Sequence, residues 1–212
     1  MNTEDLINSL VIELRPASRW HIAQRLVVGV GVGVAASIAL LFALMGPRHD
    51  LMEVLATGAF WTKATFTLSM AAASLFIVAH LARPEQSRTH LWFLAVPVLA
   101  YLPLGIDELV RTAPADWGPM LFGHGWRHCT WLIFGLSVPI FFGLCWAFRQ
   151  FAPTRLELAG AMAGICSGAV AAVVYCLHCP TDAAVFALTW YTLAFILAGG
   201  AGAFLGRRLL DW

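Results

Sequence analysis

The sequence predicts an all-α, polytopic membrane protein: a bundle of six transmembrane helices with a short cytoplasmic amphipathic helix at its N-terminus. Of its 212 residues, 60% are hydrophobic and only 12% are charged, whereas an ordinary soluble domain is about 45–50% apolar and 25% charged. Apolar residues gather in runs of about 20, the length that crosses a bilayer as a helix. The formal net charge of +1 gives no strongly basic face of the kind that binds nucleic acid, so direct nucleic-acid binding is not expected.

Residues 1–25 are predicted to form a cytoplasmic segment, and residues 26–212 the transmembrane domain. The segment lacks a basic start, a short apolar core and a cleavage site, so no secretory signal peptide is expected. Its apolar side chains recur at spacings that form one stripe of a helix: Leu6, Ile7, Leu10, Val11 and Leu14. Helices that lie on a membrane usually have a basic polar face, whereas this one carries Glu4, Asp5 and Glu13. These acids favour a protein partner over the bilayer surface.

Six apolar runs are predicted to span the membrane. They are approximately Leu26–Met45, Ala64–Leu81, Leu91–Leu109, Thr130–Phe148, Leu158–Leu177 and Ala183–Leu205. The third run contains Pro97 and Pro103, which a bundle tolerates because neighbouring helices can satisfy the backbone groups that proline frees.

The basic residues predict the orientation of the bundle. One side of the runs holds nine of them: Arg15, Arg19, Arg25, Arg83, Arg88, Arg149, Arg155, Arg207 and Arg208. The other side holds four: Arg48, Lys63, Arg111 and Arg127. By the positive-inside rule, both termini are expected in the cytoplasm of a bacterial inner-membrane protein. The opposite face would then meet the oxidising periplasm.

Two sets of glycines recur at short intervals within the spans. Gly29, Gly31 and Gly33 resemble a phosphate loop but lie inside an apolar span with no preceding strand, so the nucleotide-binding interpretation is rejected. In the fifth and sixth spans, glycines recur at intervals of four and predict smooth surfaces for close helix packing. These are Gly160, Gly164, Gly168, Gly202 and Gly206.

Asp107 and Glu108 lie at the outer end of the third span. Buried acids at such a position can mark an ion path. No other predicted span carries an acid or base near its centre, which favours carboxylates exposed at the membrane interface.

The cysteines are the strongest functional signal. Cys145 and Cys166 fall inside spans and are expected to be small apolar fillers. Cys129 and Cys179 stand at the outer ends of consecutive spans. If those spans pack as antiparallel neighbours, the two residues would approach the Cα separation of about 5–6 Å that a disulfide requires. A reversible Cys129–Cys179 pair is therefore the working hypothesis.

Further residues could assist these thiols. Protonated His128 and His178 would favour the thiolates, or could provide nitrogen ligands to a soft metal, and His124 and Cys176 could join them. Cys176 and Cys179 form a C-x-x-C pair, a weak signal because on a helix the two simply share a face. Redox or metal sensing is favoured, while a structural disulfide and coincidence remain open. The metal is unknown, and no cofactor is expected.

Several segments together resemble the NrsF family, the negative regulators of sigma F. They are Met1-Asn2-Thr3-Glu4-Asp5-Leu6-Ile7, Leu136-Ser137-Val138-Pro139, Ala152-Pro153, Tyr175-Cys176-Leu177-His178-Cys179-Pro180, Trp190-Tyr191 and Gly206-Arg207-Arg208-Leu209-Leu210-Asp211-Trp212. The resemblance covers nearly the whole chain. Cys176 and Asp211 depart from the pattern expected for the family.

The resemblance implies a six-span inner-membrane anti-sigma factor. Such a protein would hold an extracytoplasmic-function (ECF) sigma factor inactive at the membrane and release it when stress reaches periplasmic cysteines, here Cys129 and Cys179. The additional Cys176 leaves the disulfide partner open.

The alternative is an enzyme, a membrane thiol-disulfide oxidoreductase that passes electrons to a quinone. The Cys176-x-x-Cys179 pair and the nine tryptophans favour this alternative. Only one C-x-x-C is present, however, and tryptophans are expected in interfacial belts in any case. A transporter for a soft metal would need polar ligands deep within the spans, and these are sparse.

Overall fold

A computed structural model of the chain describes residues 19–46, 48, 50–81, 88–123, 125–150 and 155–210. The predicted N-terminal stripe (Leu6, Ile7, Leu10, Val11 and Leu14) and His124 lie outside these residues.

The described residues form helices and no strand. The long helices are α2 (Arg19–Leu44), α4 (Gly58–Leu81), α5 (Ala95–Arg111), α7 (Trp126–Phe148), α8 (Leu156–Tyr175) and α10 (Thr192–Leu209). The short ones are α3 (Leu51–Val54), η1 (Arg88–Leu94), η2 (Pro114–Asp116), α6 (Trp117–Phe122), α9 (Ala184–Phe186) and η3 (Ala187–Tyr191). Six helical segments are long and apolar enough to cross a membrane. The predicted all-α, six-span fold is therefore confirmed.

Some helix ends differ from those predicted by hydropathy. Helix α4 begins at Gly58, well before the predicted start at Ala64, so Lys63 lies inside the helix. Helix α8 ends at Tyr175 rather than Leu177, which puts Cys176 in the turn that follows. A hydropathy pattern places a span boundary at a charged residue, but a helix continues through that residue where its charge finds partners.

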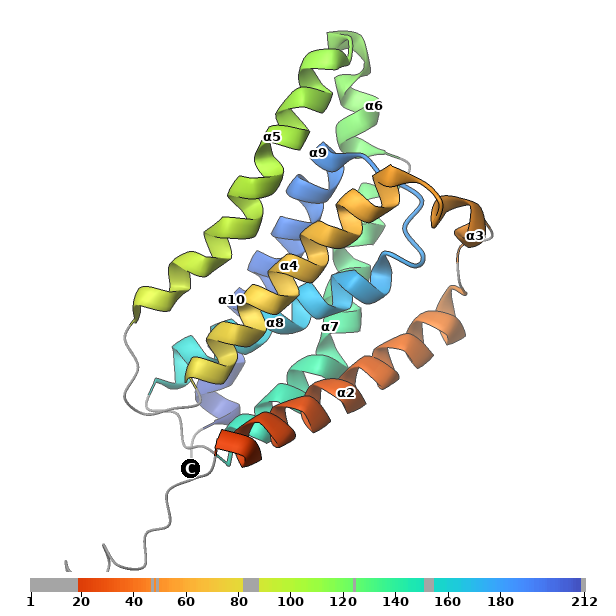
Figure 1. Cartoon of the computed structure of the whole chain (residues 1–212). Helices are drawn as coiled ribbons and strands as arrows, with labels where there is room; N and C mark the ends of the chain where they lie inside the picture. The colour runs from red at the N-terminus through yellow and green to blue at the C-terminus, as the bar shows by residue number, and fades with distance from the viewer. Residues whose placement is uncertain are drawn as a thin grey trace, which may run out of the picture.

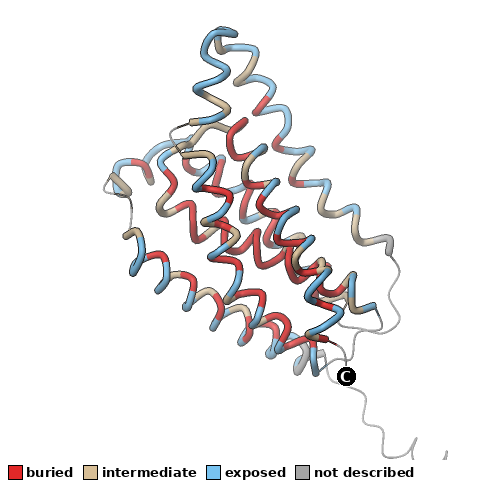
Figure 2. The backbone as a smooth tube through the Cα atoms, turned by 180° about the vertical axis from the view of Figure 1, so that it is seen from behind, coloured by how far each residue is buried: buried red, intermediate tan, exposed pale blue. Residues whose placement is uncertain are grey.

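Helix α8 is the centre of the bundle. It packs against α4, α7 and α10, and most of its residues are buried (Figure 2). Helix α5 lies at the edge of the bundle beside α4 and is largely exposed (Figure 1). The small residues of α8 allow its neighbours to approach closely, which a bilayer requires because van der Waals packing drives helix association there.

The glycines at intervals of four make the closest of these contacts. Gly160 of α8 lies against the backbone of Gly202 and Gly206 of α10, and Gly164 against Ala198 and Gly199. Gly168 faces the side chains of Ala198 and Phe195. A larger side chain at Gly160 or Gly164 would overlap main-chain atoms of α10.

A second close interface joins α2 to α7. The backbones of Gly29 and Gly143 touch, and Gly33 lies against Ile140, whereas Gly31 has open space around it. The Ser37 hydroxyl crosses the same interface and donates to the carbonyl of Leu136 at 2.7 Å. The phosphate-loop pattern therefore reflects helix packing, a role that the sequence analysis did not assign to Gly29 and Gly33.

The connecting segments gather at two ends of the bundle. At one end, the Arg48 amide donates to the carbonyl of Leu177 at 3.2 Å, and the Trp190 indole donates to the carbonyl of Leu121 at 2.6 Å. At the opposite end, near the C-terminus in Figure 1, Arg149 donates to the carbonyl of Leu209 at 2.7 Å. The loops that were expected on one face of the membrane thus lie together.

Candidate functional site

The candidate site is a turn between α8 and α9, packed against α4 and α7. The amides of His178 and Cys179 both donate to the carbonyl of Tyr175, at 2.9 and 3.0 Å, and close the end of α8. Cys176 and Cys179 therefore lie in a turn, and the expectation that they share a face of a helix is wrong. Both thiols are buried, as is Cys129.

Cys129 and Cys179 lie together. Cys129 is in the first turn of α7, where its sulfur accepts a hydrogen bond from the Tyr175 hydroxyl at 3.1 Å. The thiols of Cys129 and Cys179 lie close enough to interact, and no disulfide joins them. The structure thus places the two cysteines of the working hypothesis near each other.

Cys176 faces a different neighbour. Its sulfur lies 3.7 Å from the hydroxyl of Thr67 on α4. Cys145 and Cys166 are buried within α7 and α8, as expected for fillers. Only Cys176 thus shares the end of the bundle with the Cys129–Cys179 pair.

Of the three histidines suggested as ligands, the structure describes His128 and His178, and neither forms a hydrogen bond with the thiols. The His178 ring lies 2.9 Å from the carbonyl of Gly46 through Nδ1, and His128 is exposed on α7. Within the described part of the chain, no three His, Cys, Asp or Glu side chains are arranged to hold a metal ion. The roles suggested for His128, His178 and Cys176 as ligands stay predictions.

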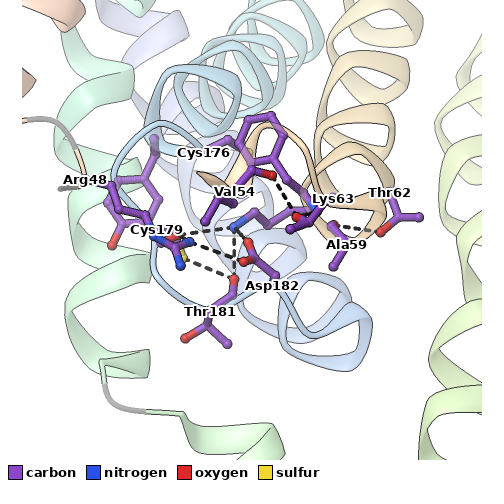
Figure 3. A network of polar contacts seen from close by, with 12 residues as sticks. Arg48, Val54, Ala59, Thr62, Lys63, Cys176, Cys179, Thr181 and Asp182 are labelled. Carbon is purple, nitrogen blue, oxygen red and sulfur yellow. Dashed lines mark hydrogen bonds and ion pairs between the residues drawn. The ribbon is translucent and has the colours of Figure 1, made fainter. Parts of the chain in front are cut away.

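A buried lysine, Lys63, also lies at this site, and nothing in the sequence pattern predicts its role (Figure 3). The Lys63 side chain has no exposed surface. Its ammonium donates to the carbonyls of Cys179 at 3.3 Å and Thr181 at 3.0 Å, and pairs with Asp182 at 2.5 Å. A buried ammonium is tolerated only with such partners, so Lys63 and the turn stabilise each other.

Arg48 reaches the same turn from the loop after α2. Its guanidinium donates to the carbonyl of Cys179 at 3.2 Å and to Asp182 at 3.2 Å, and pairs with Asp50 at 2.5 Å. In the sequence, Arg48 and Lys63 served only to predict the orientation of the bundle. Asp182 is distant from both in the sequence, and no spacing motif signals the contact.

These charges and the neighbouring thiol alter the acidity of Cys179. The neighbouring Cys129 thiol, together with the Lys63 ammonium, holds the pKa of Cys179 below its ordinary value although burial opposes this. Burial raises the pKa of Cys176 to about 11. The thiolate is the nucleophile and the metal ligand, and these surroundings favour the thiolate of Cys179 over that of Cys176.

A π-helical turn, η3, completes the surroundings of the site. π-Helical turns often occur at functional sites. The Thr130 hydroxyl on α7 donates to the carbonyl of Trp190 in η3 at 3.4 Å. Tyr191, which ends η3, is fully buried and meets the Tyr175 ring edge-on at 6.3 Å.

The two acids at the end of α5 have different roles. Asp107 forms an exposed ion pair with Arg111 at 2.8 Å, as expected for a carboxylate at the interface. Glu108 is partly buried and accepts a hydrogen bond from the Val185 amide at 2.9 Å. Glu108 therefore caps the start of α9 and supports the segment that follows the cysteine turn.

Residues 10–212 match the family described as Negative regulator of sigma F, NrsF. The chain is 40% identical to the "Probable anti-sigma-F factor NrsF" of Azospira oryzae over 215 residues, which cover 100% of both chains. It is 33% identical to the "Anti-sigma-F factor NrsF" of Caulobacter vibrioides over 214 residues, again 100% of both. No solved structure matches the chain.

Proposed function

The chain belongs to the NrsF family of negative regulators of sigma F, and from this premise we propose that it is an inner-membrane anti-sigma factor controlled by thiol chemistry. It would hold an ECF sigma factor at the cytoplasmic face of the membrane. It would release that factor when Cys129 and Cys179, on the periplasmic side, react with an oxidant or a thiol-reactive metal. The family names imply a regulatory role rather than an enzymatic one.

The observation that carries the proposal is the contact between the Cys129 and Cys179 thiols. They come from α7 and from the turn after α8, so a bond between them joins two separate elements of the bundle. Both thiols are free and are shielded from bulk solvent by Tyr175 and the Lys63 network. A small oxidant or a soft cation that enters this cluster meets two sulfurs at once.

The thiol reaction must favour one helix arrangement over another if it is to act as a switch. Shifting a population from 1:99 to 99:1 takes about 5.5 kcal/mol of such preference. A disulfide typically contributes about 2–4 kcal/mol to stability, and two thiolates bound to one metal add a comparable constraint. If the two helix arrangements were closer to equally populated, a smaller free-energy preference would suffice.

The opposite end of α7 and α8 offers a route to the sigma factor. Arg149, just after α7, contacts the carbonyl of Leu209 at the end of α10, and Glu157 at the start of α8 pairs with Arg207 of α10. Motion of α7 against α8 would therefore change the surface formed by these residues. We assign sigma binding to this surface together with the N-terminal segment 1–25 and its stripe of Leu6, Ile7, Leu10, Val11 and Leu14. The inner loop around Arg83-Pro84-Glu85 would contribute, and residues 26–212 would serve as the transmembrane sensor.

Co-purification tests the anti-sigma activity. The detergent-solubilised wild-type protein should retain a sigma factor from its host's cytoplasm, and a variant that lacks residues 1–16 should lose it. The same variant should still yield folded, six-span protein. Failure of the wild-type protein to retain a sigma factor would contradict the proposal, and reduction of a quinone by a dithiol donor would then favour the oxidoreductase.

A further inference from the structure

We propose that Lys63 determines which cysteine pairs with Cys129. By holding the backbone around Cys179, it presents that thiol to Cys129 and leaves Cys176 outside the reaction. The inference rests on the proposed thiol chemistry and identifies the residue that makes the chemistry specific.

Specificity is needed because three thiols lie at this end of the bundle. Cys129, Cys176 and Cys179 could form three different disulfides, including the short Cys176–Cys179 ring within the turn. Thiols exchange partners readily when they can reach one another. Only a bond to Cys129 would link α7 to the turn after α8, so the Cys176–Cys179 bond would consume the thiols without joining the two elements.

Lys63 contacts the main chain at Cys179 and just after it. Its ammonium binds the carbonyls of Cys179 and Thr181 and the carboxylate of Asp182. Carbonyl contacts fix the path of the backbone, and the backbone sets the direction of the Cys179 side chain. Because Lys63 is fully buried, water does not compete for these contacts.

The same face of α4 holds Cys176 away from the pair. Thr67 lies four residues after Lys63, and residues at this spacing share a face of a helix. Its hydroxyl is the group that lies 3.7 Å from the Cys176 sulfur. Lys63 and Thr67 thus hold the two ends of the C-x-x-C segment at separate places on one helix.

Oxidation by diamide illustrates the step that Lys63 directs. One thiolate adds to the N=N bond of diamide and forms an S–N bond. The partner sulfur then attacks that sulfur, the S–S bond forms, and the S–N bond breaks. The hydrazine product leaves with two electrons and the two protons of the thiols, so the protein is oxidised as diamide is reduced.

The experiment maps disulfides in the full-length protein without any sigma factor. Protein in nanodiscs is treated with diamide, free thiols are blocked with N-ethylmaleimide, and peptides are sequenced by mass spectrometry under non-reducing conditions. In the wild type, Cys129–Cys179 should exceed Cys129–Cys176 by about tenfold, the selectivity that one charge-assisted hydrogen bond can confer. Lys63→Met should abolish that excess, and Lys63→Arg, which keeps the charge, should retain most of it.

Two further variants separate the positioning of Cys179 by Lys63 from a general loss of structure. Arg111→Gln removes an exposed cation that pairs with Asp107 on its own helix, and should leave the disulfide map unchanged. Should Lys63→Met fail to fold, Asp182→Asn withdraws the ion pair with little change in shape and should also reduce the excess. An unaltered excess in Lys63→Met, or in Asp182→Asn when only that variant folds, would overturn the assignment of Lys63. If diamide forms no Cys129 disulfide in the wild type, the proposed thiol chemistry itself fails.

Discussion

The ion pair that holds the cysteine turn and the ion pair at the opposite end of the bundle differ in burial. At the cysteine end, the side chains of Lys63 and Asp182 are 0% and 20% exposed. At the opposite end, those of Arg207 and Glu157 are 70% and 56% exposed. A buried pair fixes geometry because breaking it leaves an unpaired charge, whereas an exposed pair contributes little. The cysteine turn is therefore held in one arrangement, whereas the Arg207–Glu157 pair imposes little constraint on the opposite end.

The substitution expected to have the largest effect on stability is Lys63→Met. The substitution leaves Asp182 and the Cys179 carbonyl with Arg48 alone, and removes the lysine from the Thr181 carbonyl. We expect the free energy of unfolding to fall by about 3–5 kcal/mol, the range for removing one partner of a buried pair. Unfolding in mixed micelles with increasing SDS would measure it. A loss below about 1 kcal/mol, typical of an exposed pair, would show that Lys63 is solvated.

The next test concerns the interface that runs from one end of the bundle to the other. Gly202→Leu would force side-chain atoms into the backbone of Gly160 and Gly164, and should destabilise the protein by about 1–3 kcal/mol. Gly200→Leu is the matched control, because nothing lies near that glycine. The same SDS titration applies. Equal effects from the two variants would mean that α8 and α10 do not pack through these glycines.

A smaller effect is expected from Tyr175→Phe. The change removes the hydroxyl that donates to the Cys129 sulfur and leaves the ring in place. The loss should be about 1 kcal/mol, as for a typical buried hydrogen bond. If unfolding is unchanged to within error, the Cys129 thiol does not depend on Tyr175 for its position.

The smallest effect should come from the opposite end. Arg207→Gln breaks the pair with Glu157 and should change stability by less than about 1 kcal/mol. Whatever difference remains should shrink in 1 M salt, because exposed charges are screened. A large loss of stability that does not depend on salt would contradict the description of the Arg207–Glu157 pair as exposed.

Hydropathy predicts the six spans because each is a continuous apolar run. The glycines at intervals of four predict close packing by the fifth and sixth spans, but not which glycines meet. Hydropathy places the start of α4 too late because the charge of Lys63 is typical of a loop before a span. The contact of Lys63 with Asp182 joins residues far apart in the sequence, and only the fold brings them together. The π-helical turn at Trp190 likewise depends on tertiary contacts, here with Thr130 and Leu121. The cysteines could be identified from sequence, but not the residues that orient them.

The central claim is that thiols at one end of the bundle control a sigma factor at the other. The direct measurement is release of a bound ECF sigma factor from the protein in nanodiscs after diamide treatment. Wild type and Cys145→Ser, whose thiol is a buried filler in α7, should release it, whereas Cys129→Ser and Cys179→Ser should retain it. Release from both of the latter variants as fast as from the wild type would contradict the account.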